Sequence, residues 1–178
     1  MRKIGFLIKL EKKKKLQEVE PSDEIKQAYL QRSNESLSSA RALLSIGNLK
    51  DSVALAYYAM YHCLLAALFG IGIKCENHTA AILLLSNVFG IDNTQMKKAK
   101  SERIDKQYYV DFKVNKQETE KSIRAAEDFI NEMNDFIATL SGEKIREYHQ
   151  KAVSLWTEKE KQVSNNNEPT PSTSSLAP

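Results

Sequence analysis

The chain of 178 residues carries 26 lysine and arginine residues against 23 aspartate and glutamate residues, a formal net charge of +3. This excess is too small to indicate nucleic-acid binding by itself, so a binding surface requires local clusters of charge. The hydrophobic content of 42% suffices for one sizeable core, and a single domain is expected.

The same composition argues against a membrane protein and against a disulfide-stabilised one. No run approaches the about 20 apolar residues that a membrane-spanning helix needs. The two cysteines, Cys63 and Cys75, have neither zinc-site spacing nor a disulfide framework, and no glycine-rich phosphate loop is present. We therefore expect a soluble, cytoplasmic protein with no membrane partner, no metal and no cofactor.

The first half of the chain is predicted to form a basic N-terminal arm, residues 1–20, followed by two long helices. Ser22 in the segment Pro21–Glu24 is a good N-cap, and the acidic residues after it suit the positive end of a helix dipole. A helical stripe of apolar residues then runs to Gly47, which suits the left-handed stop position. The next helix is apolar on nearly every side over residues 54–69, so we expect it to be central.

The second half continues with helices of differing character. A short apolar helix is predicted to end near Gly90, and a polar, basic stretch follows at residues 93–106. A long helix is predicted to begin at Asn115, which forms a capping-box-like pair with Glu118. Its apolar stripe has the spacing of a bundle seam and consists of Ile123, Ala126, Ile130, Met133, Ile137 and Leu140.

These elements predict an all-α protein, an antiparallel bundle of four to five helices over residues 21–140. An extra amphipathic helix is expected at residues 141–162. A disordered tail rich in Ser, Asn, Pro and Thr is expected at residues 163–178. Lys12–Lys15 in the N-terminal arm could contact phosphates, but the acidic residues that follow favour a solvated arm at least as readily.

The central helix carries the most informative segment, Ala54–His62, in which Leu55, Tyr58 and His62 share one helical face. With Gly47-Asn48 before it, the run Ala56-Tyr57-Tyr58-Ala59-Met60-Tyr61-His62 resembles the signature helix of the HEPN domain, in particular of the prokaryotic UPF0332 group. The resemblance extends to residues 30–41, to Asn77-His78, to Arg103 through Tyr108 and to residues 123–137. It covers roughly residues 20–138 and is specific in combination.

The resemblance implies a bundle that commonly forms a homodimer, with the signature helices of two subunits near a shared cleft. Many HEPN proteins are metal-independent ribonucleases, often toxins neutralised by a small nucleotidyltransferase encoded beside them. Their catalytic motif is an arginine, four to six further residues and a histidine. His62 matches that histidine, but Leu55 stands seven residues earlier, where the related group usually shows arginine.

RNA cleavage through the 2'-hydroxyl needs a group that moves protons and a cation that stabilises charge on the phosphate. Leucine carries no charge. The cation would therefore have to come from Arg41, from Arg103, from a lysine among residues 97–106 or from a dimer partner. The candidate catalytic residues are His62, Tyr58 and Arg103. The candidate nucleic-acid-binding residues are Lys97, Lys98, Lys100 and Arg103.

Two functions of different classes stay open at this point. The first is an RNA-directed component, a toxin-type or degenerate endoribonuclease, of a two-gene system with a nucleotidyltransferase partner. The second is a non-catalytic, dimeric helical interaction or nucleotide-binding module, in which His62 and Tyr58 form a satisfied polar pair in the core. His78 is interpreted as a neighbour of a helix cap rather than as a ligand.

Overall fold

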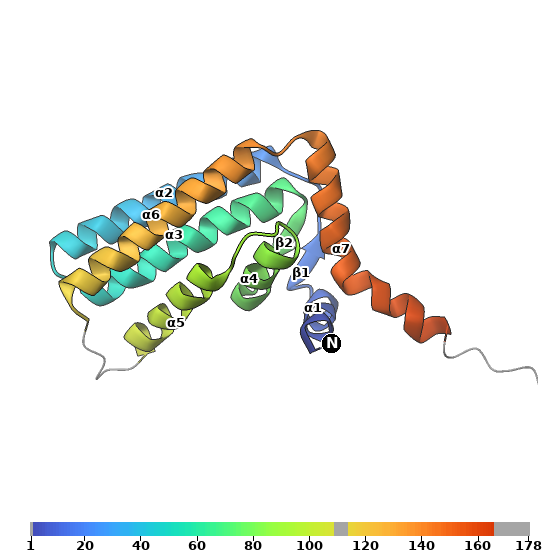
Figure 1. The fold of residues 1–178 in the computed structure, drawn as a ribbon, viewed down its shortest axis with the longest axis horizontal. Coiled ribbons are helices and arrows are strands. Elements are labelled where there is room, and N and C mark those ends of the chain that lie inside the picture. The colour runs from blue at the N-terminus through green and yellow to red at the C-terminus, as the bar shows by residue number, and fades with distance from the viewer. Residues whose placement is uncertain (1, 109–113, 166–178) are drawn as a thin grey trace, which may run out of the picture.

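The computed structural model describes residues 2–108 and 114–165, and within these ranges it consists of seven helices and one two-stranded sheet (Figure 1). In chain order the elements are α1 (Arg2–Lys12), β1 (Leu16–Glu18), α2 (Asp23–Ser45), α3 (Leu49–Gly70), β2 (Ile73–Cys75), α4 (His78–Asn87), α5 (Thr94–Tyr108), α6 (Lys116–Ala138) and α7 (Gly142–Asn165). The predicted all-α helical bundle is confirmed.

The long helices α2, α3, α5 and α6 alternate in direction along the bundle (Figure 1). Their ends follow the local signals of the sequence. The Ser22 side chain accepts a hydrogen bond from the backbone N–H of Ile25, and the Asn115 side chain accepts one from Glu118. Gly47 has a φ of 78°, the left-handed conformation that ends α2 and allows the short turn into α3.

Helix α3 is the core of the fold, as its composition predicts. Large side chains along it, including Met60, Leu64 and Leu68, are almost completely buried. By length and composition α3 could cross a membrane, contrary to the expectation that no segment is apolar enough. However, 83% of the 18-residue apolar stretch of α3 is buried inside the bundle, as in the core helix of a soluble protein.

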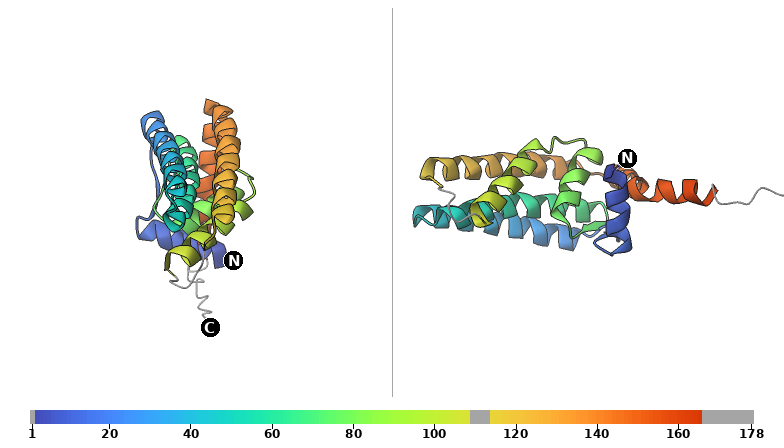
Figure 2. Two further views of the ribbon diagram at one scale, coloured as in Figure 1. Left: turned by 90° about the vertical axis from the view of Figure 1, so that its left-hand side faces the viewer. Right: turned by 90° about the horizontal axis from the view of Figure 1, so that it is seen from below.

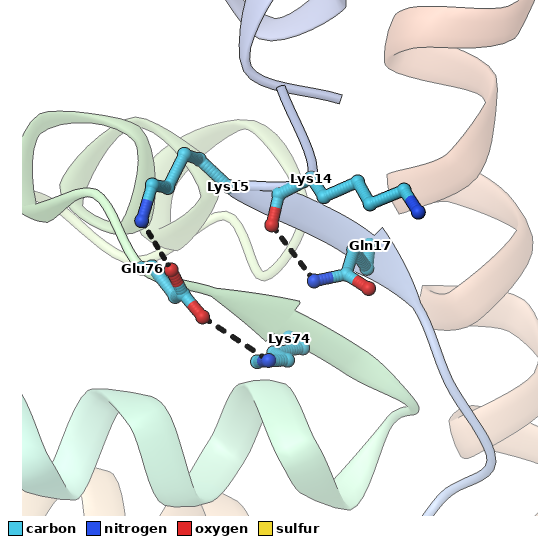
Figure 3. A network of polar contacts seen from close by, with 5 residues as sticks. All are labelled: Lys14, Lys15, Gln17, Lys74 and Glu76. Atoms are coloured by element: carbon cyan, nitrogen blue, oxygen red, sulfur yellow. Dashed lines mark hydrogen bonds and ion pairs between the residues drawn. The ribbon is translucent and has the colours of Figure 1, made fainter. Parts of the chain in front are cut away.

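The predicted arm, residues 1–20, contains α1 and β1, which pack against the rest of the fold. Leu7 and Leu16 are buried, and β1 pairs antiparallel with β2, with Leu16 opposite Cys75. The carboxylate of Glu76 joins the two strands, because its oxygens lie 2.8 Å from Lys15 Nζ and 3.1 Å from Lys74 Nζ (Figure 3). The sequence analysis missed this small sheet.

Helix α7 lies outside the bundle of long helices and contacts α1. Figure 2 shows α1 lying across one end of the bundle, with α7 running on beyond it. Trp156 and Ala152 on α7 are buried, and Tyr148 makes an edge-on ring contact with Phe89 at 5.4 Å between centroids. Of the predicted disordered tail, residues 163–165 form the end of α7, and residues 166–178 lie outside the described residues. The division of the chain into four segments stays a prediction.

Candidate functional site

Five aromatic and imidazole rings gather where α3 meets the start of α4. We call them the tyrosine–histidine cluster, which consists of Tyr57, Tyr58, Tyr61, His62 and His78. Four of them lie on one face of α3 because they form two pairs separated by four residues, Tyr57 with Tyr61 and Tyr58 with His62. The rings of Tyr61 and His78 stack at 3.8 Å between centroids, and those of Tyr58 and His62 at 6.1 Å.

The hydrogen bonds of His62 determine which of its ring nitrogens carries the proton. Its Nδ1 lies 3.2 Å from Oγ of Ser36, on the neighbouring helix α2. The Ser36 hydroxyl donates its own proton to the carbonyl oxygen of Arg32 at 2.8 Å. While the Ser36 hydroxyl donates to Arg32, its Oγ accepts from Nδ1 of His62, and this is the tautomer that the arrangement favours. In the neutral imidazole this leaves Nε2 of His62 as an unprotonated acceptor.

The environment favours this neutral form of His62. Burial lowers the pKa of its imidazole, and the positive charge of Arg32 lowers the pKa further, while a hydrogen bond to the Arg32 backbone opposes them. The side chain is half-buried. A neutral imidazole with a free Nε2 lone pair is the form that can accept a proton, which is the requirement for a general base.

His78 has the opposite arrangement. Its Nδ1 lies 2.6 Å from the hydroxyl oxygen of Tyr57. Burial raises the pKa of Tyr57 far above its ordinary value, although Arg103 opposes the shift, so the phenol keeps its proton and can donate it to Nδ1. Burial and the charges of Arg103 and Lys100 lower the pKa of His78 to about 4. His78 is thus neutral near pH 7, and with the phenol as donor its proton is on Nε2.

Arg103 of α5 brings a permanent positive charge to the cluster. Its guanidinium carbon lies 5.1 Å from the ring centre of Tyr58 and 5.8 Å from that of Tyr57, within the range of a cation–π contact. Its buried Nε has no hydrogen-bond partner among the described residues. Lys100, one turn earlier on α5, donates a hydrogen bond to the Thr79 hydroxyl beside His78.

The structure thus brings together some of the sequence-predicted residues and separates others. Tyr58 contacts both His62 and Arg103, which places the three candidate catalytic residues in one cluster. Of the candidate nucleic-acid-binding residues, Lys97 and Lys100 line a groove of about 550 Å³ between α4 and α5. Lys98 lines a different pocket, between α3, α5 and α6, and lies 4.0 Å from Glu102. The predicted roles stay predictions.

Two further sequence-predicted positions bear on the cation that the cluster would use. Leu55 is partly buried and packs against the hydrophobic core, so its position on α3 supplies no charge. Arg41 forms an ion pair with Glu127 at 2.7 Å. Of the two arginines that sequence reasoning offered as substitutes, Arg103 is therefore the one that lies against the tyrosine–histidine cluster.

Sequence reasoning missed the contribution of Ser36, Tyr57 and His78. Asn77 does cap α4, because its side chain accepts a hydrogen bond from Ala80 N at 3.0 Å, so His78 is the neighbour of a cap as predicted. Its side chain nevertheless points into the cluster and contacts Tyr57 and Tyr61. The only sequence signal was the position of Asn77-His78 at the start of a helix, and it does not reveal the partner on α3.

The fold and the cluster together define a class of protein: an all-helical bundle whose central helix presents tyrosines and a histidine beside a basic helix. The sequence profile of the HEPN domain matches residues 26–136, which is more than half of the chain. The protein belongs to the HEPN family. A search of curated proteins returned no match.

Proposed function

We propose that this protein is an RNA-directed HEPN protein that cleaves RNA without a metal ion, with His62 as the general base. The observation that carries the proposal is the hydrogen-bond chain from His62 through Ser36 to the Arg32 carbonyl, which leaves Nε2 of a neutral imidazole free. In the reaction, Nε2 takes the proton of a 2'-hydroxyl, and the resulting oxygen attacks the adjacent phosphorus. The bond to the 5'-oxygen breaks and that oxygen takes a proton from water, giving a cyclic phosphate and a 5'-hydroxyl end.

Arg103 supports this chemistry from a second helix. Charge builds up on the phosphate oxygens as the 2'-oxygen attacks, and a guanidinium stabilises such charge through paired hydrogen bonds. Arg103 lies against Tyr58, which stacks on His62, so it is one cation that could replace the arginine absent at position 55. Arg32, whose positive charge lowers the pKa of His62, is a second. The partly exposed ring of Tyr58 provides a surface on which a base can stack, whereas Tyr61 is buried and stacks on His78.

The finer features implied by the family resemblance belong to the same proposal. They are membership of the UPF0332 group, a homodimer that brings two signature helices together, a toxin–antitoxin role with a nucleotidyltransferase partner, and a cytoplasmic location. The support for them is the match of residues 26–136 to the HEPN domain, whose members commonly dimerise and often are toxin-type ribonucleases.

A second function is favoured by one specific observation. Leu55 packs against the core where the related proteins usually carry an arginine, and His62 is half-buried. This arrangement favours a non-catalytic, dimeric interaction module or a nucleotide-binding module. In that case the tyrosine–histidine cluster would stabilise the helices or a partner interface rather than react.

A cleavage assay on single-stranded RNA in the presence of a chelator tests the two functions against each other. In His62→Asn, a side-chain N–H remains near the position of Nδ1 for Ser36, but Nε2 is removed. We expect this variant to lose between about 10² and 10⁴ in cleavage rate, the usual share of a general base. Arg103→Ala is expected to lose a similar factor, with partial rescue in Arg103→Lys.

The control is His149→Asn, which changes a histidine far from the cluster along the chain and is expected to cleave at the wild-type rate. Equal cleavage by wild type and His62→Asn would contradict the proposal. Absence of cleavage by the wild type, with dimer formation lost in His62→Ala, would establish the interaction module instead.

A further inference from the structure

The resemblance gives His78 no catalytic part, and the proposed function above does not use it. We propose that His78 binds a phosphate oxygen of RNA through its Nε2–H, as a neutral hydrogen-bond donor that acts together with Arg103 and Lys100. This inference rests on the proposed function because it takes the ligand to be RNA. It concerns binding alone, so it can fail or succeed independently of cleavage.

The first step is the fixed position of the proton on His78. The Tyr57 hydroxyl lies 2.6 Å from Nδ1, and we take the phenol as the donor of this bond, which puts the ring proton of the neutral imidazole on Nε2. Among the described residues, Nε2 of His78 has no hydrogen-bond partner of its own. His78 therefore presents one N–H group whose direction is set by the phenol on the opposite side of the ring.

The second step is the rigidity of the imidazole. The Tyr61 ring stacks on His78 at 3.8 Å with an interplanar angle of 10°, and the Tyr58 ring makes an edge contact at 6.2 Å. With the Tyr57 ring at 5.6 Å between centroids, three ring contacts and one hydrogen bond hold the imidazole before any ligand binds. A donor that is already ordered loses little conformational entropy when it binds, and this favours affinity.

The third step is the charge around His78. Arg103 and Lys100 supply permanent positive charge, and both disfavour a further positive charge on His78. The residue is also the first of α4, where the N–H groups of the helix end add a positive potential. The two cations attract an anion, and the neutral imidazole orients it. A phosphate group, with several acceptor oxygens and a negative charge, matches this combination.

The proton positions can be observed directly by ¹⁵N NMR of the full-length protein, because the chain contains three histidines. We expect His78 to be protonated on Nε2 and His62 on Nδ1 in neutral solution. In Tyr57→Phe, which removes only the hydroxyl, His78 is expected to become a mixture of both tautomers. A wild-type His78 protonated on Nδ1 would overturn the proposal.

Binding is tested with a single-stranded RNA oligonucleotide whose 2'-hydroxyls are all methylated, which prevents cleavage, and separately with inorganic phosphate. The matched variant is His78→Asn, whose side-chain oxygen can still accept from Tyr57 but which lacks the Nε2–H. We expect about tenfold or more weaker oligonucleotide binding, the effect of losing one hydrogen bond to a charged group. The His78 Nε2 resonance is expected to shift when either probe binds to the wild type.

Three outcomes would overturn the inference: no binding of either probe to the wild type, equal oligonucleotide affinity in wild type and His78→Asn, or binding that leaves the Nε2 resonance unmoved. If His78→Asn fails to fold, Tyr57→Phe takes its place and must bind more weakly than wild type. Binding through His78 without cleavage of ordinary RNA would refute only the ribonuclease reaction. Cleavage of RNA by the wild type together with unchanged oligonucleotide affinity in His78→Asn would refute only this inference.

Discussion

The Ser36 hydroxyl oxygen lies 3.2 Å from Nδ1 of His62 and 2.8 Å from the Arg32 carbonyl oxygen, an arrangement in which it donates to Arg32 and accepts a hydrogen bond from Nδ1. One serine on α2 thus selects the tautomer of a histidine on α3. Because the choice leaves Nε2 of His62 as the free acceptor, Ser36 acts as a positioning residue for the proposed general base. The sequence separation of 26 residues hides this relationship from any local pattern.

Ser36→Ala should therefore alter the chemistry of His62 more than the stability of the protein. Without the acceptor, Nδ1 loses its partner and His62 populates both tautomers, so we expect about a tenfold loss of cleavage rate. Alanine is a good helix former, and the hydrogen bond of Ser36 to Arg32 lies within α2. The free energy of unfolding should therefore change little. Cleavage rate and urea denaturation measure the two effects.

The matched control is Ser38→Ala, the same change at an exposed position of α2. It is expected to leave both cleavage and stability as in the wild type. A Ser36→Ala protein that keeps the wild-type rate and the wild-type pH profile of cleavage would show that Ser36 does not position His62.

Leu55→Arg is expected to raise RNA cleavage, by tenfold or more on the scale of a positioned arginine in phosphate chemistry. Positions 55 and 62 are two helical turns apart, about 10 Å along the axis, and an arginine side chain can reach back across that distance toward the same phosphate. Leu55 is only partly buried, so a charged side chain can leave the core. Leu55→Met, which conserves volume, is the control and should cleave as the wild type does. An unchanged rate in a folded Leu55→Arg protein would contradict the proposed geometry.

Much of the fold could be predicted because its signals are local. Ser22, Gly47 and Asn115 act within a few residues of their positions, and each does in the structure what its residue type indicated. The central place of α3 followed from its uniform apolar composition. The pairing of β1 with β2 could not be seen, because it joins two three-residue strands with more than 50 residues between them in the chain.

The site was predictable only in part for the same reason. His62 and Tyr58 were found because both lie on one helix, four residues apart. The contact of Arg103 with Tyr58, and that of His78 with Tyr57, depend on how α4 and α5 pack against α3, and packing carries no short sequence signature. For the basic stretch at 93–106, the composition suggested a single basic surface. In the structure Lys98 lines a different pocket from Lys97 and Lys100.

The attachment of α7 should depend on pH through His149. Its Nδ1 lies 2.7 Å from the Ile71 carbonyl oxygen and its Nε2 lies 2.9 Å from a Glu18 carboxylate oxygen, so both nitrogens face acceptors. Burial alone would lower the pKa of His149, but the bonds to Glu18 and Ile71 and the nearby charge of Glu20 raise it above its usual value. The folded state therefore favours the protonated form.

The sign of the effect follows from linkage. A histidine with a raised pKa in the folded state contributes stability that is fully present below its unfolded pKa of about 6.5 and is lost as the pH rises through the folded value. We compare the urea midpoints of wild type and His149→Gln from pH 5.5 to 8.5. The wild type should have the higher urea midpoint at pH 5.5, and the difference between the two midpoints should narrow toward pH 8.5. Glu18→Gln should show the same narrowing, and a gap independent of pH would contradict the assignment.

Gly72→Ala should destabilise the protein far more than Gly90→Ala, although both glycines have left-handed backbones with φ of 78° and 75°. Each substitution places a Cβ in a conformation that costs about 1 kcal/mol or more. At Gly90 the new Cβ meets nothing within 4 Å, and the cost ends there. At Gly72 it would lie 2.5 Å from the Val19 carbonyl oxygen and 3.0 Å from Nδ1 of His149.

The backbone of Gly72 is held in place because its carbonyl oxygen accepts a hydrogen bond from Val19 N at 2.9 Å, next to the β1–β2 pair. Relief of the clash would therefore have to separate β1 from the turn after α3 and loosen His149, and with it α7. We expect a loss of at least about 3 kcal/mol in the free energy of unfolding for Gly72→Ala, against about 1 kcal/mol for Gly90→Ala. Urea denaturation of the two variants measures the difference, and equal losses would show that the Val19 and His149 contacts do not constrain this turn.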